Sequence, residues 1–307
     1  MKGKKKTYAQ VAFLLALIVG TVLIVKQQRD MPYQKDEGFI FGTVYHVTYQ
    51  YDKDLNNEII AELNKVDCEF SMFNKKSTVA AFNNGKKVEA SDMFMNVLTL
   101  SQDVSKDTNG AFDITVAPLV NAWGFGFKHQ KMPDQQQIDS LRKLVGMQYI
   151  NVEKLNGKTY LSKKLKNMML DFSAVAKGFG SDAVATVMRR HDIKNYMVEI
   201  GGEVVTSGLS EKRLPWKIGV TQPSDDSLNT NQELQTVLNI TDKAMATSGN
   251  YRNFYYKNGK KYAHEIDPKT GRPVQHSLLS STVLANRCAE ADAYATAFMV
   301  LGIEKSQ

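Results

Sequence analysis

The stretch FYYKNGKKYAHEIDPKTGRPV, residues 254–274, decides between two ways in which this chain could combine helices and strands. Asn258-Gly259 lies between two runs rich in aromatic residues, and this dipeptide is one of the strongest short-range signals for a β-hairpin. Pro268 and Gly271 then form a second turn, because proline fixes φ and glycine accepts positive φ. Strands joined by such short turns run antiparallel. The stretch therefore favours an antiparallel sheet over a doubly wound parallel one.

Helices and strands are mixed along the rest of the chain, which predicts an α+β fold. Composition and alternation predict strands at 42–51, 195–202, 216–223, 235–242 and 280–286, and two more within 158–173. Apolar spacing predicts helices at 56–66, 91–106, 138–146, 176–190 and 288–302. The polar stretch 224–235 is expected to be a loop.

The positive charge of the chain is concentrated at its N-terminus. The whole chain of 307 residues has a formal net charge of +7, and residues 1–30 hold six basic residues and one acidic residue. The remaining residues are therefore nearly neutral. A neutral body lacks the basic surface that nucleic acid requires, so no nucleic-acid partner is expected.

An uncharged stretch at residues 7–25 follows the first four lysines. Its length is about enough to cross a hydrocarbon core of roughly 30 Å. A cleaved signal peptide is the alternative, but no small-x-small site follows the apolar run. The lysines before the span place the N-terminus in the cytoplasm and the body outside. We expect a basic tail and anchor at 1–29, a polar linker at 30–38 and a folded domain at 39–307.

His264 belongs to the strand expected at 260–266, where it shares a face with Tyr262 and Ile266. This face is the more apolar one, so His264 is expected to point inward. A histidine in that position is more often a satisfied core residue than a catalytic one, because a catalytic role needs further groups around it. Both interpretations stay open on these residues alone.

Asp292 and Thr296 are four residues apart on the expected C-terminal helix and project from one face. A carboxylate and a hydroxyl are hard oxygen donors that suit Mg²⁺. The alternative is a simple contact between the two side chains on a solvated face. The alanines between and beside them, at 291, 293, 295 and 297, leave the helix slim enough for close packing.

Residues 170–182, LDFSAVAKGFGSD, predict a strand that ends at Asp171 and a helix that begins near Ala176. Lys177 then lies in the first helical turn, where a cation is unfavourable unless an anion is bound nearby. A phosphate at a helix N-terminus is a common physical solution. A surface lysine is the equally open alternative.

Two further stretches suit either a ligand or ordinary packing. Residues 109–127 contain several aromatic side chains beside Asp113, and these rings could stack on a planar ligand or form core. Gly201-Gly202 follows a strand and allows either close approach of a ligand or a tight turn.

Taken in order, eight motifs over roughly 39–302 resemble the ApbE family, the FAD:protein FMN transferases. They are GTVY, FSMFNKKSTVAAFNN, GAFDITVAPLVNAWGFG, LDFSAVAKGFGSD, YMVEIGGE, ATSGNYR, YAHEIDPKTGRPV and ADAYAT. The resemblance implies a T-fold-like α+β core with a mostly antiparallel sheet and flanking helices. It also implies an enzyme that uses Mg²⁺ and FAD, and that transfers FMN through a phosphoester to a Ser or Thr hydroxyl of a target protein, releasing AMP.

The same resemblance implies a target that is a subunit of a membrane redox pump, such as a sodium-pumping NADH:quinone reductase or an Rnf-type complex. The domain would then lie on the periplasmic face of the inner membrane. Two alternatives use the same residues. One is an FAD pyrophosphatase that yields FMN and AMP, and the other is a membrane-anchored flavin-binding protein without turnover.

The resemblance also implies roles for particular residues. His264 corresponds to the histidine of the H-x-x-D-P motif, to which a catalytic role is assigned. The implied metal ligands are the side chains of Asp292 and Thr296 and the backbone carbonyl of Ala174. The implied FAD contacts are Phe41, Phe73, Ala111, Phe112, Asp113, Asp171, Lys177 and Ile266.

The chain departs from the family pattern in two places. Phe41 stands where relatives often have methionine. The chain also stops at LGIEKSQ, where family members usually continue through a further helix and strand. The resemblance therefore predicts a truncated C-terminus and a sheet without one edge strand.

Overall fold

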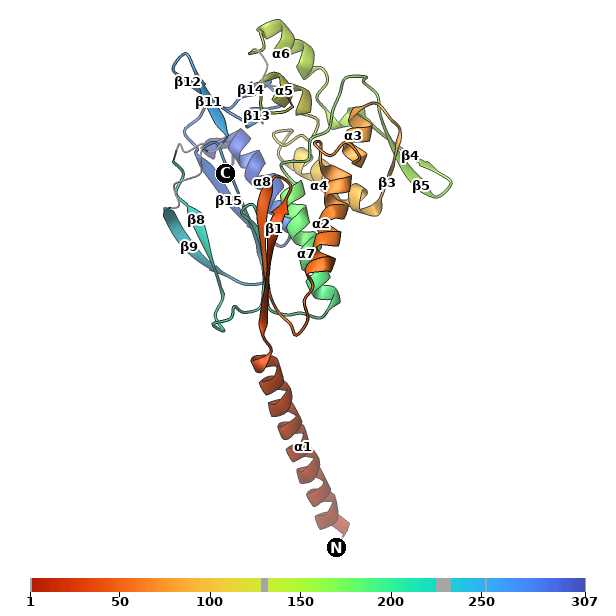
Figure 1. Cartoon of the computed structure of the whole chain (residues 1–307), viewed down its shortest axis with the longest axis vertical. Helices are drawn as coiled ribbons and strands as arrows, with labels where there is room; N and C mark the ends of the chain where they lie inside the picture. The colour runs from red at the N-terminus through yellow and green to blue at the C-terminus, as the bar shows by residue number, and fades with distance from the viewer. Residues whose placement is uncertain (1, 128–131, 225–232, 252, 307) are drawn as a thin grey trace.

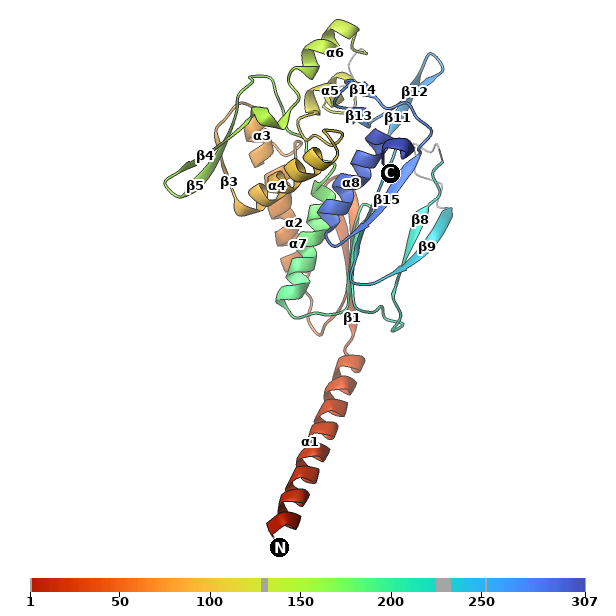
Figure 2. The same ribbon diagram turned by 180° about the vertical axis from the view of Figure 1, so that it is seen from behind.

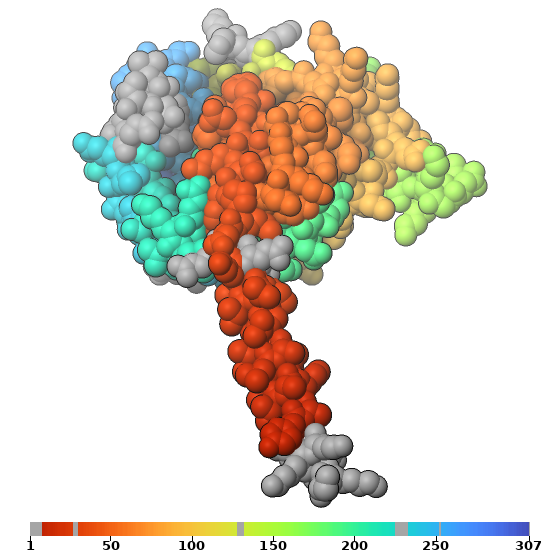
Figure 3. All heavy atoms as spheres, turned by 60° about the horizontal axis from the view of Figure 1, so that its bottom comes forward, coloured from red at the N-terminus to blue at the C-terminus, as the bar shows by residue number. Residues whose placement is uncertain are grey.

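A long N-terminal helix, α1 (Lys2–Asp30), projects away from a folded domain (Figures 1 and 3). The computed structural model describes residues 2–127, 132–224, 233–251 and 253–306. Within α1, the segment Tyr8–Lys26 has a mean hydropathy of 2.4 and is not buried by any part of the domain. By length and composition, this helix is a candidate for a membrane span, and a signal sequence has the same properties.

The centre of the domain is a six-stranded sheet of order β1-β2-β6-β7-β10-β15, in which all neighbours are antiparallel. The predicted α+β fold with a mostly antiparallel sheet is confirmed. The strands are β1 (Tyr33–Ile40), β2 (Thr43–Gln50), β6 (Tyr196–Ile200), β7 (Glu203–Ser207), β10 (Ala244–Gly249) and β15 (Ser280–Ala285).

The polar linker expected at 30–38 is largely wrong, because β1 occupies most of it. This strand pairs with β2 from Tyr33 opposite Gln50 to Ile40 opposite Thr43. β1 is the edge of the sheet, and alternate side chains along it are exposed. Charged residues are common on edge strands, where they discourage pairing with other chains, and so they mask the strand in the sequence.

The two faces of the sheet are covered differently. One face packs against α2 (Asn56–Phe70), α7 (Ala176–Arg190) and α8 (Cys288–Leu301), and the other carries the hairpin of β8 (Trp216–Thr221) and β9 (Leu234–Ile240). Neighbouring residues in β7 show the alternation, because Val205 belongs to the helix-side core and Val204 to the hairpin-side core.

The remaining helices and strands lie in two places. Some surround one end of α8, and others belong to a separate sheet at the edge of the domain (Figures 1 and 2). Between strand β2 and residue 150 lie helices α3 (Thr78–Asn83), α4 (Asp92–Asp107), α5 (Ala117–Ala122) and α6 (Gln135–Arg142) and the 3₁₀ turn Met147–Tyr149, and a second 3₁₀ turn, Ile303–Lys305, follows α8. A three-stranded sheet contains β3 (Val88–Ala90), β5 (Lys158–Lys163) and β4 (Ile150–Leu155), and two small hairpins contain β11 (Phe254–Lys257) with β12 (Lys260–Ala263) and β13 (Ile266–Asp267) with β14 (Arg272–Pro273).

The second strand expected within 158–173 is absent among these described elements. Residue Leu170 instead has both of its backbone groups satisfied by one side chain, since Asn83 Oδ1 accepts from its N–H at 2.8 Å and Asn83 Nδ2 donates to its carbonyl at 2.9 Å. A buried backbone can therefore run as a loop here without losing hydrogen bonds. The loop expected at 224–235 falls mostly on residues 225–232, outside the described part.

Helices α7 and α8 cap each other. Asp292 Oδ2 on α8 accepts from Gly178 N–H in the first turn of α7 at 3.0 Å, and Asp182 on α7 accepts from Cys288 and Ala289 N–H at the start of α8 at 2.9 and 3.0 Å. The first N–H groups of a helix have no partner within it, so each helix satisfies the other. The two helices also touch closely, because a Cβ at Gly178 would lie 2.4 Å from the carbonyl oxygen of Cys288.

We expect Asp182→Ala to lower the free energy of unfolding by about 1–2 kcal/mol, the usual cost of losing a helix cap. Urea unfolding followed by circular dichroism measures this change. Asp103→Ala, an exposed aspartate within α4, is the matched control and should shift stability by less than about 0.5 kcal/mol. Equal effects of the two substitutions would contradict the capping role.

Candidate active site

One cavity of about 460 Å³ opens where loops 111–116 and 171–174, the end of β10, the segment 264–268 and α8 meet. Its size lies within the usual range for small-molecule and cofactor sites. The wall combines aromatic rings with several carboxylates and one lysine. The cavity therefore suits a ligand that has both a planar apolar part and a charged part.

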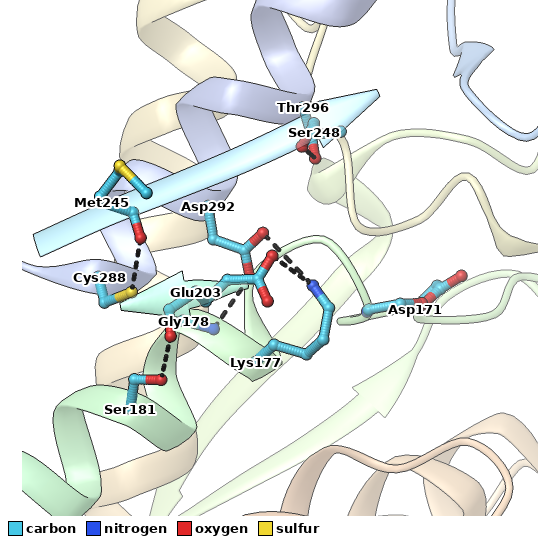
Figure 4. A network of polar contacts seen from close by, with 11 residues as sticks. Asp171, Lys177, Gly178, Ser181, Glu203, Met245, Ser248, Cys288, Asp292 and Thr296 are labelled. Carbon is cyan, nitrogen blue, oxygen red and sulfur yellow. Dashed lines mark hydrogen bonds and ion pairs between the residues drawn. The ribbon is translucent and has the colours of Figure 1, made fainter. Parts of the chain in front are cut away.

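A lysine and two buried carboxylates form the polar centre of the cavity (Figure 4). Lys177 Nζ lies 2.9 Å from Glu203 Oε1 and 3.8 Å from Asp292 Oδ1, and both carboxylate side chains are almost fully buried. Burial raises the pKa of Glu203 and of Asp292, although Lys177 opposes this. Burial also lowers the pKa of Lys177, but the two carboxylates outweigh it and raise that pKa above its usual range.

Asp292 and Thr296 do not contact each other on a solvated face, and that interpretation is wrong. Asp292 is 2% exposed, and Thr296 Oγ1 instead lies 3.1 Å from Ser248 Oγ on β10 (Figure 4). The alanines around them are fully buried, which confirms the close packing expected for a slim helix.

The donors around Asp292 fit a hard cation such as Mg²⁺. Glu203 Oε2 is buried and has no hydrogen-bond partner among the described residues. Among all the residues that the structure describes, no group of three or more His, Cys, Asp or Glu side chains is arranged as a complete metal site. A cation held here would therefore take further ligands from backbone oxygens, from substrate phosphate or from water, as Mg²⁺ usually does.

Asp113 and Asp171 each close a turn beside the cavity. Asp113 accepts from Thr115 N–H at 2.8 Å and from its hydroxyl at 2.6 Å, and Asp171 likewise accepts from the N–H and hydroxyl of Ser173. Burial raises the pKa of both carboxyl groups, while these hydrogen bonds oppose the shift. Both loops are thus fixed by their own side chains, and both line the cavity.

His264 lies in the cavity wall rather than in the core. It follows β12, and 41% of its side chain is exposed, so the core interpretation is wrong. Its Nδ1 lies 3.3 Å from Glu265 Oε2, within ion-pair distance but without hydrogen-bond alignment. Glu265 is 5% exposed and neither of its carboxylate oxygens has a hydrogen-bond partner among the described residues. A buried carboxylate of this kind would stabilise positive charge that forms beside it, and the His264 ring is the group nearest to it.

Aromatic residues behind His264 form a stacked series. Phe125 stacks on Tyr255, which stacks on Tyr262, which stacks on Trp123, with ring centroids 5.3 to 5.7 Å apart. Phe125 lines the cavity, so one end of this series faces the ligand space. The ring of Phe73 is 69% exposed and contacts Phe127 at the cavity rim.

Comparison with known proteins identifies the family. The ApbE family pattern matches residues 41–307. The chain belongs to the ApbE family. It is 38% identical to the FAD:protein FMN transferase of Haemophilus influenzae over 88% of this chain and 81% of that protein. It is 35% identical to the Escherichia coli K12 enzyme of the same name, over 88% and 79%. The solved structure of the flavin transferase ApbE from Vibrio cholerae matches with a TM-score of 0.80 at 34% identity, covering 90% of this chain and 89% of that one.

The cavity brings together all but one of the site residues that the ApbE resemblance implies. Those in its wall are Phe73, Ala111, Phe112, Asp113, Asp171, Ala174, Lys177, His264, Ile266, Asp292 and Thr296. Phe41 is not among the lining residues. It packs between the two largest cores, against Gly180 of α7, with a φ of 53°. Its ring therefore supports the helix rather than the cavity wall.

Three polar residues of the site were not singled out in the sequence. Glu203 was visible only as the residue after Gly201-Gly202, Ser248 as part of ATSGNYR, and Glu265 as the residue after His264. The partners of Glu203 and Ser248 lie far away in the chain, and the burial of Glu265 beside His264 is not visible in the sequence, so spacing alone gives no signal. A polar residue directly after a tight turn or within an apolar strand is the one weak hint.

The stability of the metal-free protein should fall as pH rises, and Glu203 should contribute to this fall. Burial raises the pKa of Glu203 from 4.5 to about 8, so between these values the folded state holds a proton that the unfolded chain releases. A rise in pH across this window therefore lowers the free energy of unfolding, by at most about 1.4 kcal/mol per pH unit for one proton.

Urea unfolding in EDTA at several pH values between 5 and 8 measures this slope. Glu203→Gln should make the curve flatter than that of the unsubstituted protein, whereas Glu153→Gln, on the exposed face of β4, should leave it unchanged. Parallel curves for all three proteins would contradict the assignment.

Proposed function

We propose that this chain is an FAD:protein FMN transferase that uses Mg²⁺ and transfers FMN to a Ser or Thr hydroxyl of a target protein. The observation that carries the proposal is that Lys177, Asp292 and Thr296 share one cavity with His264 and several aromatic rings. FAD contains a planar ring system, which aromatic side chains can contact, and a charged pyrophosphate, which a lysine and a bound cation can hold. The names of the relatives support the same activity.

Asp292 and Thr296, with the carbonyl of Ala174, are the residues that would hold Mg²⁺. When bound, the ion supplies positive charge to the phosphate oxygens and polarises the phosphorus under attack. Lys177 contributes a second positive charge from the first turn of α7. Ser248 Oγ lies 3.1 Å from Thr296 Oγ1, and the Thr296 hydroxyl would keep a lone pair for the ion when it donates this hydrogen bond.

His264 is the proposed general base. The acceptor oxygen forms a bond to the phosphorus of the FMN half, the bond from that phosphorus to the bridging oxygen breaks, and AMP leaves with the electron pair. The hydroxyl proton passes to His264, and the carboxylate of Glu265 at 3.3 Å stabilises the resulting imidazolium. Little covalent help is needed from the protein, since phosphoryl transfer depends mainly on positioning and charge.

The test is to incubate residues 31–307 with Mg²⁺, FAD and a target protein or peptide, and to measure the mass of the acceptor. We expect an FMN adduct. His264→Gln should lower its rate of formation by about 10²–10⁴-fold, the usual contribution of a general base. Asp292→Asn keeps an oxygen for Gly178 N–H but weakens the cation site, so the adduct should fall to background.

Asp103→Asn on the exposed face of α4 is the matched control and should leave the rate unchanged. AMP and free FMN that appear without an acceptor would instead identify a pyrophosphatase. FAD that stays intact with Mg²⁺ and acceptor present would identify a binding protein. An adduct that Asp292→Asn does not reduce would reject the proposed site.

We also propose that α1 anchors the domain to the inner membrane, with the domain on the periplasmic face, where it meets the acceptor subunit of an Nqr- or Rnf-like redox pump. Support comes from the apolar segment Tyr8–Lys26 and from the four lysines that precede it. The domain begins immediately after the helix, since Gln50 Nε2 donates to the carbonyl of Met31 at 2.8 Å.

The full chain should remain with membranes after a carbonate wash, whereas residues 31–307 should be soluble and folded. Residues 39–307 should fold poorly, because this shorter chain lacks most of β1 and loses the hydrogen bond from Tyr49 to Asp36. Fractionation, circular dichroism and the mass of the mature protein measure these outcomes. A mature protein that has lost residues 1–25 would identify a cleaved signal instead.

A further inference from the structure

A second cavity of about 240 Å³ lies on the opposite face of the main sheet from α7 and α8. It lies between that face and strand β8, is partly open to solvent, and we call it the back groove. Its own wall includes Met197, Glu199, Val204, Lys217, Val220 and Met245. Gly201, Thr247 and Tyr251 line both the back groove and the active cavity, so the two spaces meet there.

The meeting point lies beside the polar centre of the active cavity. Gly201 and Gly202 form the turn between β6 and β7, with φ of 62° and 103°, and Glu203 follows them directly. Thr247 precedes Ser248, the partner of Thr296. Neither residue of the turn has a side chain, and the space beside Gly202 is open, since a Cβ there would meet no atom within 4 Å. The back groove thus leads to the residues proposed to hold the phosphates.

The edge of β10 is open at this same place. β10 pairs with β7 only at Ala244 and Met245, whereas its pairing with β15 continues to Gly249. The carbonyl of Lys243 accepts from Thr206 N–H on the β7 side. In an antiparallel strand, every second residue directs its backbone N–H and C=O groups to the same neighbouring strand. Residues 247 and 249 therefore point these groups in the same direction as Lys243, to the side where β7 lies but beyond the point at which β7 ends.

We propose that the back groove binds an extended segment of the acceptor protein, which adds as a short strand to β10 at residues 247–249. Its Ser or Thr hydroxyl then passes the glycine turn and reaches the active cavity. The proposal rests on the proposed function, which requires a protein substrate beside the phosphates. A peptide fits the open edge because it supplies alternating N–H and C=O groups, the basis of recognition by strand addition. The adenosine half of FAD does not supply them.

Glu199→Trp tests the proposal by filling the back groove. Glu199 lines only this space, and its partly exposed side chain pairs with His46 at 3.1 Å, so the fold does not depend on it. The matched control is Glu153→Trp on β4, also a strand glutamate with one ion-pair partner, Lys87, and outside both cavities. Lys217→Glu at the exposed wall of the groove is a second variant that leaves the core unchanged.

The probe is a pool of twelve-residue peptides with a central threonine and randomised flanks. Two quantities are measured: FMN addition by mass, and retention of peptides by the immobilised protein with AMP present and no turnover. In Glu199→Trp, kcat/KM for the selected peptide should fall at least about tenfold, while KM for FAD and acceptor-free release of AMP change less than about twofold. Glu153→Trp should match the unsubstituted protein in both quantities.

Peptides N-methylated at alternate positions provide the backbone test. Methylation of the amides that point to one edge of the extended segment, the edge next to β10, should abolish retention. Methylation of the amides that point to the other edge should not. A rise in KM for FAD with no change for the peptide would overturn the proposal and assign the groove to adenosine. If no peptide acquires FMN, the proposed transfer fails, and the groove is judged by retention alone: loss in Glu199→Trp supports it, and equal retention overturns it.

Discussion

The mutual capping of α7 and α8 is the constraint on which the rest of the domain depends. Each helix begins with N–H groups that an aspartate of the other helix accepts, Asp292 in one direction and Asp182 in the other. The two N-terminal turns can be satisfied only when they lie side by side. This requirement brings Lys177, in the first turn of α7, next to the carboxylate of Asp292. The contact that fixes the fold therefore also assembles the polar centre of the site.

The glycines of AKGFGSD are explained by this close packing. Gly178 lies where α7 crosses α8, with no room for a Cβ, and a Cβ at Gly180 would lie 2.6 Å from the ring of Phe41. Phe41 has a positive φ because it is the first residue of the two-residue turn between β1 and β2. Its place between two cores explains why a residue that the family pattern associates with flavin does not line the cavity here. Packing of α7 and the proposed binding of a ligand would thus use different sides of one short motif.

The sequence predicts elements well where local signals and tertiary environment agree. Turn residues and alternation identify β6, β8, β9, β15 and the β11–β12 hairpin, and apolar spacing identifies α2, α4, α7 and α8. β1 escapes because edge strands carry charge, and β10 escapes because AMATSG is small and polar. At the site, the family motifs bring nearly every implied residue to one cavity. Glu203 and Ser248 could not be recognised, because only the fold brings their partners to them, and Glu265 could not because only the fold buries it.

The balance of charge in the cavity provides the strongest physical argument for a cation in the proposed reaction. The described lining residues include five carboxylates, at positions 113, 171, 203, 265 and 292, and Lys177 is the only lysine or arginine among them. A pyrophosphate adds further negative charge in a partly buried space, where repulsion is stronger than in water. Burial raises the pKa of Glu203 to about 8, so protonation of this carboxyl group near neutral pH relieves part of the repulsion. A divalent ion at Asp292 and Thr296 would relieve the rest, and it would do so at the atoms where the transfer needs positive charge.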